Sequence, residues 1–182
     1  MQRVGRPSIV TIDKENHMNK LEMFDHALKT IVEQGGFSVN ENGHCLYLNS
    51  DGYRCGAGSF IAPQNYLPEF EYCGVWWTQD DYDLAAEGES VSELEARKKL
   101  VQAVAETVGE ITQEKSDFIR RIQKAHDNGS AEDCQYSLAA DSEDERVQSF
   151  EKVLYKYFSK IAEEEGFDSE ELLKLKKRIT KE

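Results

Sequence analysis

Four cysteines are the residues of this 182-residue chain with the clearest potential for chemistry. Cys45, Cys55 and Cys73, together with His44, could supply the sulfur and nitrogen ligands that zinc accepts in a tetrahedral site. Their spacing contains no Cys-x-x-Cys pair, which a zinc knuckle normally needs. Reduced thiols that pack as small hydrophobic groups fit the spacing better, so we predict no metal and no other cofactor. Cys134 lies in a polar stretch and is expected to be incidental.

A second chemical signal is His126-Asp127, which is similar to the dyad of metal-dependent HD phosphohydrolases. Those enzymes need further histidine and aspartate ligands from neighbouring helices, and the other histidines of this chain fall in no such pattern. The competing interpretation is a helix end, because an imidazole is favourable at a helix C-terminus and Asp-Asn-Gly at residues 127–129 favours a turn. A metal-dependent hydrolase is therefore the least favoured function.

The sequence also contains a potential nucleophile. Cys55 follows Arg54, whose charge could lower the pKa of the thiol. The small residues at 56–58 are typical of close backbone packing, and no oxyanion-hole pattern accompanies them, so we predict no catalytic residue. The region could instead border a pocket for a small molecule, such as a nucleotide signal, beside the helix that ends at His126. The expected lining residues are Tyr47, Arg54, Cys55, His126 and Asp127.

An aromatic and acidic run gives the clearest signal for an interface. Trp76 and Trp77 are followed by Asp80, Asp81 and Asp83. Aromatic rings supply much of the contact energy in interfaces, and the carboxylates would steer a basic protein surface toward them. The alternative is that one indole fills the core while the other lies along its rim.

The overall charge limits the classes of partner. The net charge is −13, with one acidic run between Arg54 and Arg97 and a second from Glu132 to Glu145. Binding to DNA or RNA phosphates needs clustered cations, so direct nucleic-acid binding is not expected. No apolar run approaches the roughly 20 residues of a membrane span, and residues 1–20 lack a secretory h-region. These features favour a cytoplasmic protein.

The elements that must position these residues are mainly helical. Apolar residues at three- and four-residue spacing predict helices over 19–34, 90–111, 118–126 and 145–165, with a short basic helix near the C-terminus. Asn49 to Gly52 separates two short apolar runs and predicts a tight hairpin between Cys45 and Cys55. No internal repeat is evident.

These elements predict a mainly α (α+β) fold, with four to five helices around one core and a small two-stranded β-hairpin. We expect residues 1–18 to be a flexible N-terminal extension and residues 19–167 to be a single globular domain. Residues 168–182 are expected to form a C-terminal short helix or tail.

The order of the motifs resembles a family of small uncharacterised proteins of tailed phages and prophages. Members of that family join a CLYR-like strand and a DG turn to a KCAVGCLIPDE-like run, with a later LQ-x-x-HD helix end and a last amphipathic helix. Ser59 stands where the family often has a third cysteine, which weakens a shared cysteine metal site. The matching pieces here are Cys45 to Tyr47, Asp51-Gly52, Arg54 to Pro63, Tyr66, Ile122 to Asp127 and Ile161 to Phe167.

The resemblance implies a phage or mobile-element accessory protein in the cytoplasm of a bacterial host, and it implies no activity. We therefore expect a non-enzymatic protein that binds a host or phage protein through the acidic aromatic residues 76–83. Such binding could inhibit a bacterial defence or transcription factor. The alternatives are a small-molecule or nucleotide-binding protein and, least favoured, the metal-dependent hydrolase.

Overall fold

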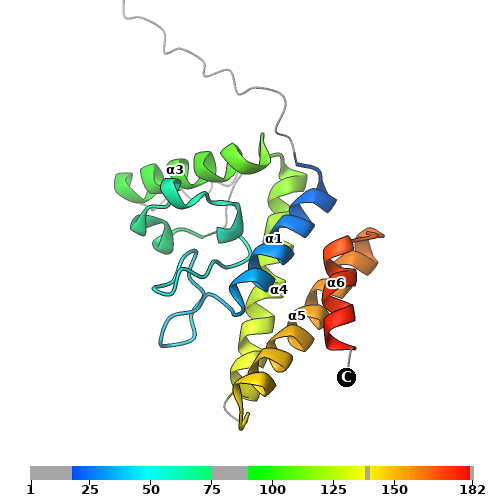
Figure 1. Ribbon diagram of the computed structural model, residues 1–182. Helices are drawn as coiled ribbons and strands as arrows, with labels where there is room; N and C mark the ends of the chain where they lie inside the picture. Colours follow the sequence, from blue (N-terminus) through cyan, green and yellow to red (C-terminus); the bar gives the residue numbers. More distant parts are fainter. Residues whose placement is uncertain (1–17, 75–89, 138–139, 181–182) are drawn as a thin grey trace, which may run out of the picture.

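The computed structural model describes residues 18–74, 90–137 and 140–180. Three short 3₁₀ helices, η1 (Gly58–Phe60), η2 (Pro63–Asn65) and η3 (Pro68–Tyr72), precede α3. The prediction of a mainly α fold is confirmed. Among the described helices, none combines the length and the apolar character that crossing a membrane requires. The described α-helices are α1 (Lys20–Gln34), α3 (Val91–Val108), α4 (Gln113–Ser137), α5 (Glu143–Glu165) and α6 (Glu170–Ile179) (Figure 1).

Several helix ends follow local sequence signals. Asn19 and Ser90 begin α1 and α3 with capping boxes, in which the side chain accepts the backbone N–H three residues on and the glutamate there binds the N–H of the cap. Gly35 and Gly166 end α1 and α5 with φ angles of 76° and 70°. Glycine enters this left-handed region without a steric cost, so it stops a helix efficiently.

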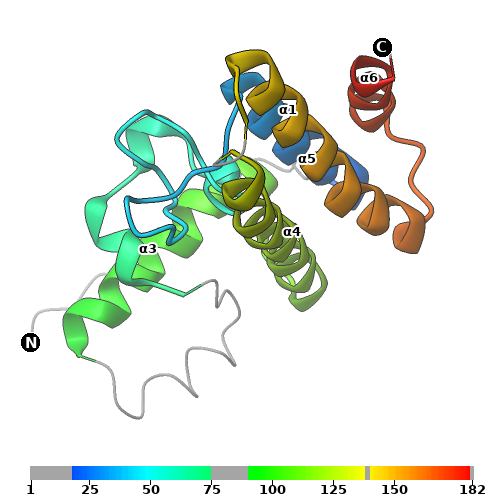
Figure 2. The ribbon, with the colours of Figure 1, turned by 90° about the horizontal axis from the view of Figure 1, so that it is seen from below.

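Helices α1, α4, α5 and α6 pack together on one side of the molecule (Figure 2). α5 contacts both α4 and α6, and α1 contacts both α4 and α6. The ring of Phe24 in α1 lies against Phe158 of α5 and Phe167, with centroid separations of 5.5 and 5.7 Å. Leu175 of α6 is fully buried in the same core. The C-terminal helix therefore contributes to the packing of the domain.

The other side of the molecule is α3 together with residues 37–73, which we call the irregular segment. α3 contacts η1 and η3 of this segment, and Figure 2 shows both on the side of α4 away from α6. Phe60 and Phe70 of the segment and Val104 of α3 are fully buried. Apolar side chains therefore hold the irregular segment to the helices, although it has little regular hydrogen bonding of its own.

The predicted β-hairpin is wrong. The described residues contain no strand, only two isolated antiparallel bridges, which pair Val39 with Cys45 and Leu48 with Arg54. A ladder does not extend because side chains from other parts of the chain take the backbone groups that it would need. The Glu71 carboxylate accepts the N–H groups of Tyr47 at 2.9 Å and Leu48 at 3.1 Å.

The two bridges close two loops of the same design, at residues 40–44 and 49–53. In each loop the N–H of the first asparagine donates to the carbonyl of the fifth residue, at 2.8 and 3.0 Å. The side-chain oxygen of that asparagine accepts the N–H groups of the third and fifth residues. The fourth residue is Gly43 or Gly52, with φ angles of 77° and 84°. The two loops therefore share the turn pattern Asn-x-Asn/Asp-Gly.

The predicted helix end at residues 126–129 is also wrong, because α4 continues through Gly129 to Ser137. A Cβ atom on Gly129 would lie 2.8 Å from Cζ of Phe37. The glycine lets an aromatic ring approach the helix, and the surrounding packing keeps the residue helical. His126 accordingly lies in the interior of α4, so the interpretation of this histidine as a helix-end residue fails.

Candidate functional site

Three cysteines that are distant in the sequence line one cavity of about 170 Å³, which we call the thiol cavity. Five of its lining residues come from the irregular segment and one comes from α4. All four cysteines of the chain are unbridged, and Cys134 is exposed on α4. The lining residues of the thiol cavity are Cys45, Tyr47, Cys55, Glu71, Cys73 and Gln123.

Gln123 ties α4 to the wall of the cavity. Its Oε1 accepts the N–H of Ala57 at 2.8 Å. Its Nε2 donates to Cys45 Sγ at 3.0 Å and to Asp127 Oδ1 at 2.6 Å. Because Gln123 is buried and bonded through both ends of its amide, it fixes the position of the Cys45 sulfur relative to the helix.

His126 is fully buried behind Cys45. The backbone N–H of Ser38 donates to Nε2 at 3.2 Å, so the neutral ring carries its proton on Nδ1. Nδ1 lies 3.7 Å from Cys45 Sγ and 3.4 Å from Asp127 Oδ1, and its N–H faces these acceptors. Burial lowers the pKa of His126, whereas the contacts with Asp127 and Cys45 raise it, and the net direction is upward. If Nε2 were also protonated, however, its N–H would point at the N–H of Ser38, and the hydrogen bond between these two groups would be lost.

The Nδ1–H tautomer of His126 argues against a metal centre formed by Cys45, His126 and Asp127. Cys45, His126 and Asp127 each bring a potential ligand atom within 4.8 Å of the other two. Ligation through Nδ1 would move the ring proton to Nε2, where the Ser38 amide already donates. In this arrangement His126 is a hydrogen-bond donor. Within the described ranges no second His-Asp pair joins it, so the ligand set of an HD phosphohydrolase is not assembled there.

The pKa of the Cys45 thiol is raised well above its usual range by the neighbouring Cys55 and by burial. The N–H of Gly58 donates to Cys55 Sγ at 3.3 Å. Catalytic thiols have lowered pKa values and partial exposure. Cys45 lacks the first property, and Cys55, at 2% exposure, lacks the second.

Glu71 holds the opposite wall of the cavity. Besides the two backbone N–H groups, its carboxylate accepts the hydroxyl of Tyr66 at 2.9 Å. Burial and then the hydrogen bond with Glu71 raise the pKa of Tyr66 to about 12. The hydroxyl of Tyr47 donates to the carbonyl of Cys73 at 3.0 Å, and burial raises the pKa of Tyr47 as well. The cavity is therefore lined by one protonated phenol, that of Tyr47, and by the Glu71 carboxylate, whose oxygens already accept three hydrogen bonds.

The structure brings together part of the predicted ligand pocket. Tyr47 and Cys55 line the thiol cavity, and His126 and Asp127 lie behind it against Cys45. Arg54 does not line the thiol cavity; it borders a separate gap that is too small to hold a ligand.

Sequence reasoning missed Glu71 and Gln123, which organise the two walls of the cavity. Gln123 belongs to the LQ-x-x-HD-like motif but was given no role, and Glu71 lies in no motif. For Glu71 the only available signal was a polar residue next to positions expected to be buried. The predicted partner-binding residues lie outside the described part of the chain; they are Trp76, Trp77, Asp80, Asp81 and Asp83.

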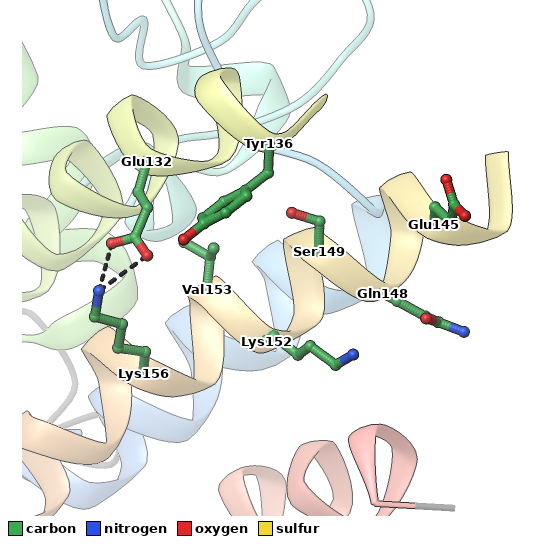
Figure 3. Close-up of a pocket in the computed structure, with 8 residues that line it drawn as sticks. All are labelled: Glu132, Tyr136, Glu145, Gln148, Ser149, Lys152, Val153 and Lys156. Atoms are coloured by element: carbon green, nitrogen blue, oxygen red, sulfur yellow. Dashed lines mark hydrogen bonds and ion pairs between the residues drawn. The ribbon is translucent and has the colours of Figure 1, made fainter. Parts of the chain in front are cut away.

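A larger hollow lies beside the C-terminal part of α4. This α4–α5 groove has a volume of about 410 Å³. Figure 3 shows the Tyr136 ring extending from α4 toward Val153 on α5. Lys156 is ion-paired with Glu132 at 2.6 Å, and the hydroxyl of Tyr157 donates to the same carboxylate at 2.7 Å. The groove is lined by Glu132, Tyr136, Glu145, Gln148, Ser149, Lys152, Val153 and Lys156.

Comparison of the chain with protein-family models, with curated proteins and with solved structures gives no match. Functional inference therefore depends on the two hollows and their surroundings.

Proposed function

We propose that this chain is a non-enzymatic binding protein whose partner presents a basic peptide segment. The observation that carries the proposal is the exposure of Tyr136, 53%, beside the α4–α5 groove. Exposed aromatic side chains next to a hollow are the usual anchors of a protein interface. Val147, in the first turns of α5, is 45% exposed near the same end of the molecule.

The charge at this end supports a basic partner. Residues 132–145 contain six acidic residues and no lysine or arginine. Asp141, Glu143, Asp144 and Glu145 are exposed. Acidic residues in the first turn of a helix interact favourably with its dipole. Because these side chains are exposed, their negative charge also remains available to a partner in solution. A cationic segment lying in the groove would meet this field and the Tyr136 ring.

The acidic aromatic residues 76–83 keep their place in the proposal as a second contact region for a protein partner. We also propose a phage or mobile-element accessory role, for which the order of the motifs from Cys45 to Phe167 is the support. Binding of a host or phage protein, with inhibition of a defence or transcription factor as one outcome, fits that context. The thiol cavity gives nucleotide binding little support, because ligand pockets usually measure about 300–1,000 Å³.

Site-specific photo-crosslinking tests the groove. Benzoylphenylalanine at position 136 should crosslink a basic protein from bacterial lysate, and the same group at the exposed position 177 on α6 should not. Glu143→Gln combined with Asp144→Asn should weaken the crosslink, since it removes two charges at the groove end. Glu163→Gln combined with Asp168→Asn removes the same charge at the far end of α5 and is the matched control. Equal crosslinking from positions 136 and 177 would refute the proposal.

A further inference from the structure

We propose that Cys45, Cys55 and Cys73 bind one thiophilic d¹⁰ cation of the Zn²⁺ and Cd²⁺ class in the thiol cavity. Three of the four cysteines of the chain line this one cavity although Cys45 and Cys73 are 28 positions apart in the sequence. Thiolates are the preferred protein ligands of such ions. The site is separate from the α4–α5 groove and does not depend on the proposed partner.

The hydrogen-bond polarity around the sulfur atoms suits thiolate ligands. Gln123 Nε2 donates to Cys45 Sγ at 3.0 Å, and the Nδ1–H of His126 faces the same sulfur at 3.7 Å. The backbone N–H of Gly58 donates to Cys55 Sγ at 3.3 Å. Donors aimed at coordinating atoms orient them and stabilise their negative charge. Gln123 and His126 are therefore positioning residues, and the cysteines are the ligands.

The three sulfurs line one cavity but do not all lie within 4.8 Å of one another, so binding requires local side-chain changes. In the structure the Cys73 Sγ–H donates to the carbonyl of Glu69 at 3.5 Å. Zinc–sulfur bonds of about 2.3 Å place sulfurs on one tetrahedral ion about 3.8 Å apart. Cys73 would give up its bond to Glu69 and turn toward the other two sulfurs. Because the oxygens of Glu71 are occupied by Tyr47, Leu48 and Tyr66, the fourth ligand is water from the cavity.

Each cysteine thiol loses its proton as its sulfur binds the cation as a thiolate, so metal binding releases protons to the solvent. Titration of the reduced, metal-free protein with Cd²⁺ should produce sulfur-to-metal charge-transfer absorbance that saturates at one ion per chain. Co²⁺ should give the visible bands of a tetrahedral thiolate centre. Cys45→Ser, Cys55→Ser and Cys73→Ser should each lose most of the absorbance, and Cys134→Ser should keep all of it.

Thiol protection gives a readout that needs no variant. With Cd²⁺ bound, alkylation of the native protein followed by mass spectrometry should label Cys134 and leave Cys45, Cys55 and Cys73 unmodified at least tenfold longer than in the free protein.

His126→Asn should weaken Cd²⁺ binding without removing the charge-transfer band. The proposal fails if no band forms in the wild type, if Cd²⁺ protects Cys134 as strongly as the other three, or if the band disappears with His126→Asn while surviving Cys73→Ser.

Discussion

The side-chain amide of Gln34 pairs with the backbone of Arg54 as a neighbouring strand would. Oε1 of Gln34 accepts the N–H of Arg54 at 2.9 Å, and Nε2 donates to its carbonyl at 2.8 Å. The same Nε2 donates to the carbonyl of Gly36 at 2.8 Å. One glutamine at the end of α1 thus supplies the hydrogen bonds that a second strand would have given the irregular segment.

Replacing Gln34 with leucine should therefore destabilise the fold. Both backbone groups of Arg54 would lose their partners, and leaving such partly buried groups unsatisfied costs about 1–3 kcal/mol each. Chemical denaturation should show a lower midpoint with an unchanged slope. Glu33→Gln, at the exposed neighbouring position, is the control and should change the unfolding free energy by less than about 0.5 kcal/mol. A Gln34→Leu protein as stable as this control would contradict the pairing.

Gly58→Ala should be among the most damaging single substitutions in the described chain. A Cβ atom at Gly58 would overlap with the backbone oxygen of Tyr47, which a side-chain rotation cannot relieve. We expect a loss above about 3 kcal/mol, since overpacking against backbone forces the chain to move.

Gly129→Ala is the informative comparison for this glycine. Its Cβ would meet the end of the Phe37 ring, a side chain with some freedom to move, and alanine gains about 1 kcal/mol of helix propensity over glycine. The loss should therefore be much smaller than for Gly58→Ala in thermal unfolding followed by circular dichroism. Equal losses at the two positions would show that the approach of residue 58 to Tyr47 is not tight.

Tyr66 should titrate late and weaken the fold at alkaline pH. Its pKa in the folded protein is about 12, against an ordinary value of 10.0. As the pH rises past 10, the unfolded chain releases this proton while the folded chain keeps it. Stability that is fully present below pH 10 is then lost as the pH rises through about 12. In a pH titration followed by tyrosinate absorbance, Tyr66→Phe should remove one phenol that ionises at high pH. Glu71→Gln should lower the pKa of Tyr66, and an unchanged pKa in this variant would contradict the contact.

Glu165 should contribute to stability near neutral pH and lose that contribution in acid. Burial by itself raises the pKa of this carboxyl, but the hydrogen bonds and charges of Lys20 and Arg121 outweigh it and hold the pKa below 4.5. The unfolded chain therefore binds the proton first as the pH falls. The stability difference between wild type and Glu165→Gln should be present above pH 4.5 and shrink as the pH falls below it. A pH-independent difference in denaturation midpoint would refute this linkage.

The helical part of the fold was predictable because its signals are local. Asn19, Ser90, Gly35 and Gly166 mark helix ends through bonds within a few residues, and the apolar stripes between them are periodic. Gly129 shows where this reasoning stops, because its neighbour Phe37 is 92 residues away in sequence. The sequence alone does not distinguish a glycine that ends a helix from one that lets an aromatic ring pack against the helix.

The irregular segment and the thiol cavity were less predictable. The hairpin interpretation identified the turn at residues 49–53 correctly in position, but it could not detect that Gln34 and Glu71 take the backbone bonds on either side. Glu71, two residues before Cys73, binds the backbone N–H groups of Tyr47 and Leu48, which follow Cys45 closely in the chain. The absence of a Cys-x-x-Cys pair led to the prediction of reduced thiols that pack as small hydrophobic groups. The thiols are unbridged as predicted, but spacing could not show that three of them line one cavity.

The uninterrupted course of α4 has a mechanical consequence. Gln123 at the thiol cavity and Tyr136 at the α4–α5 groove stand on one rod, 13 residues and so about 20 Å apart. A tilt of α4 as a rigid body would therefore move both side chains together.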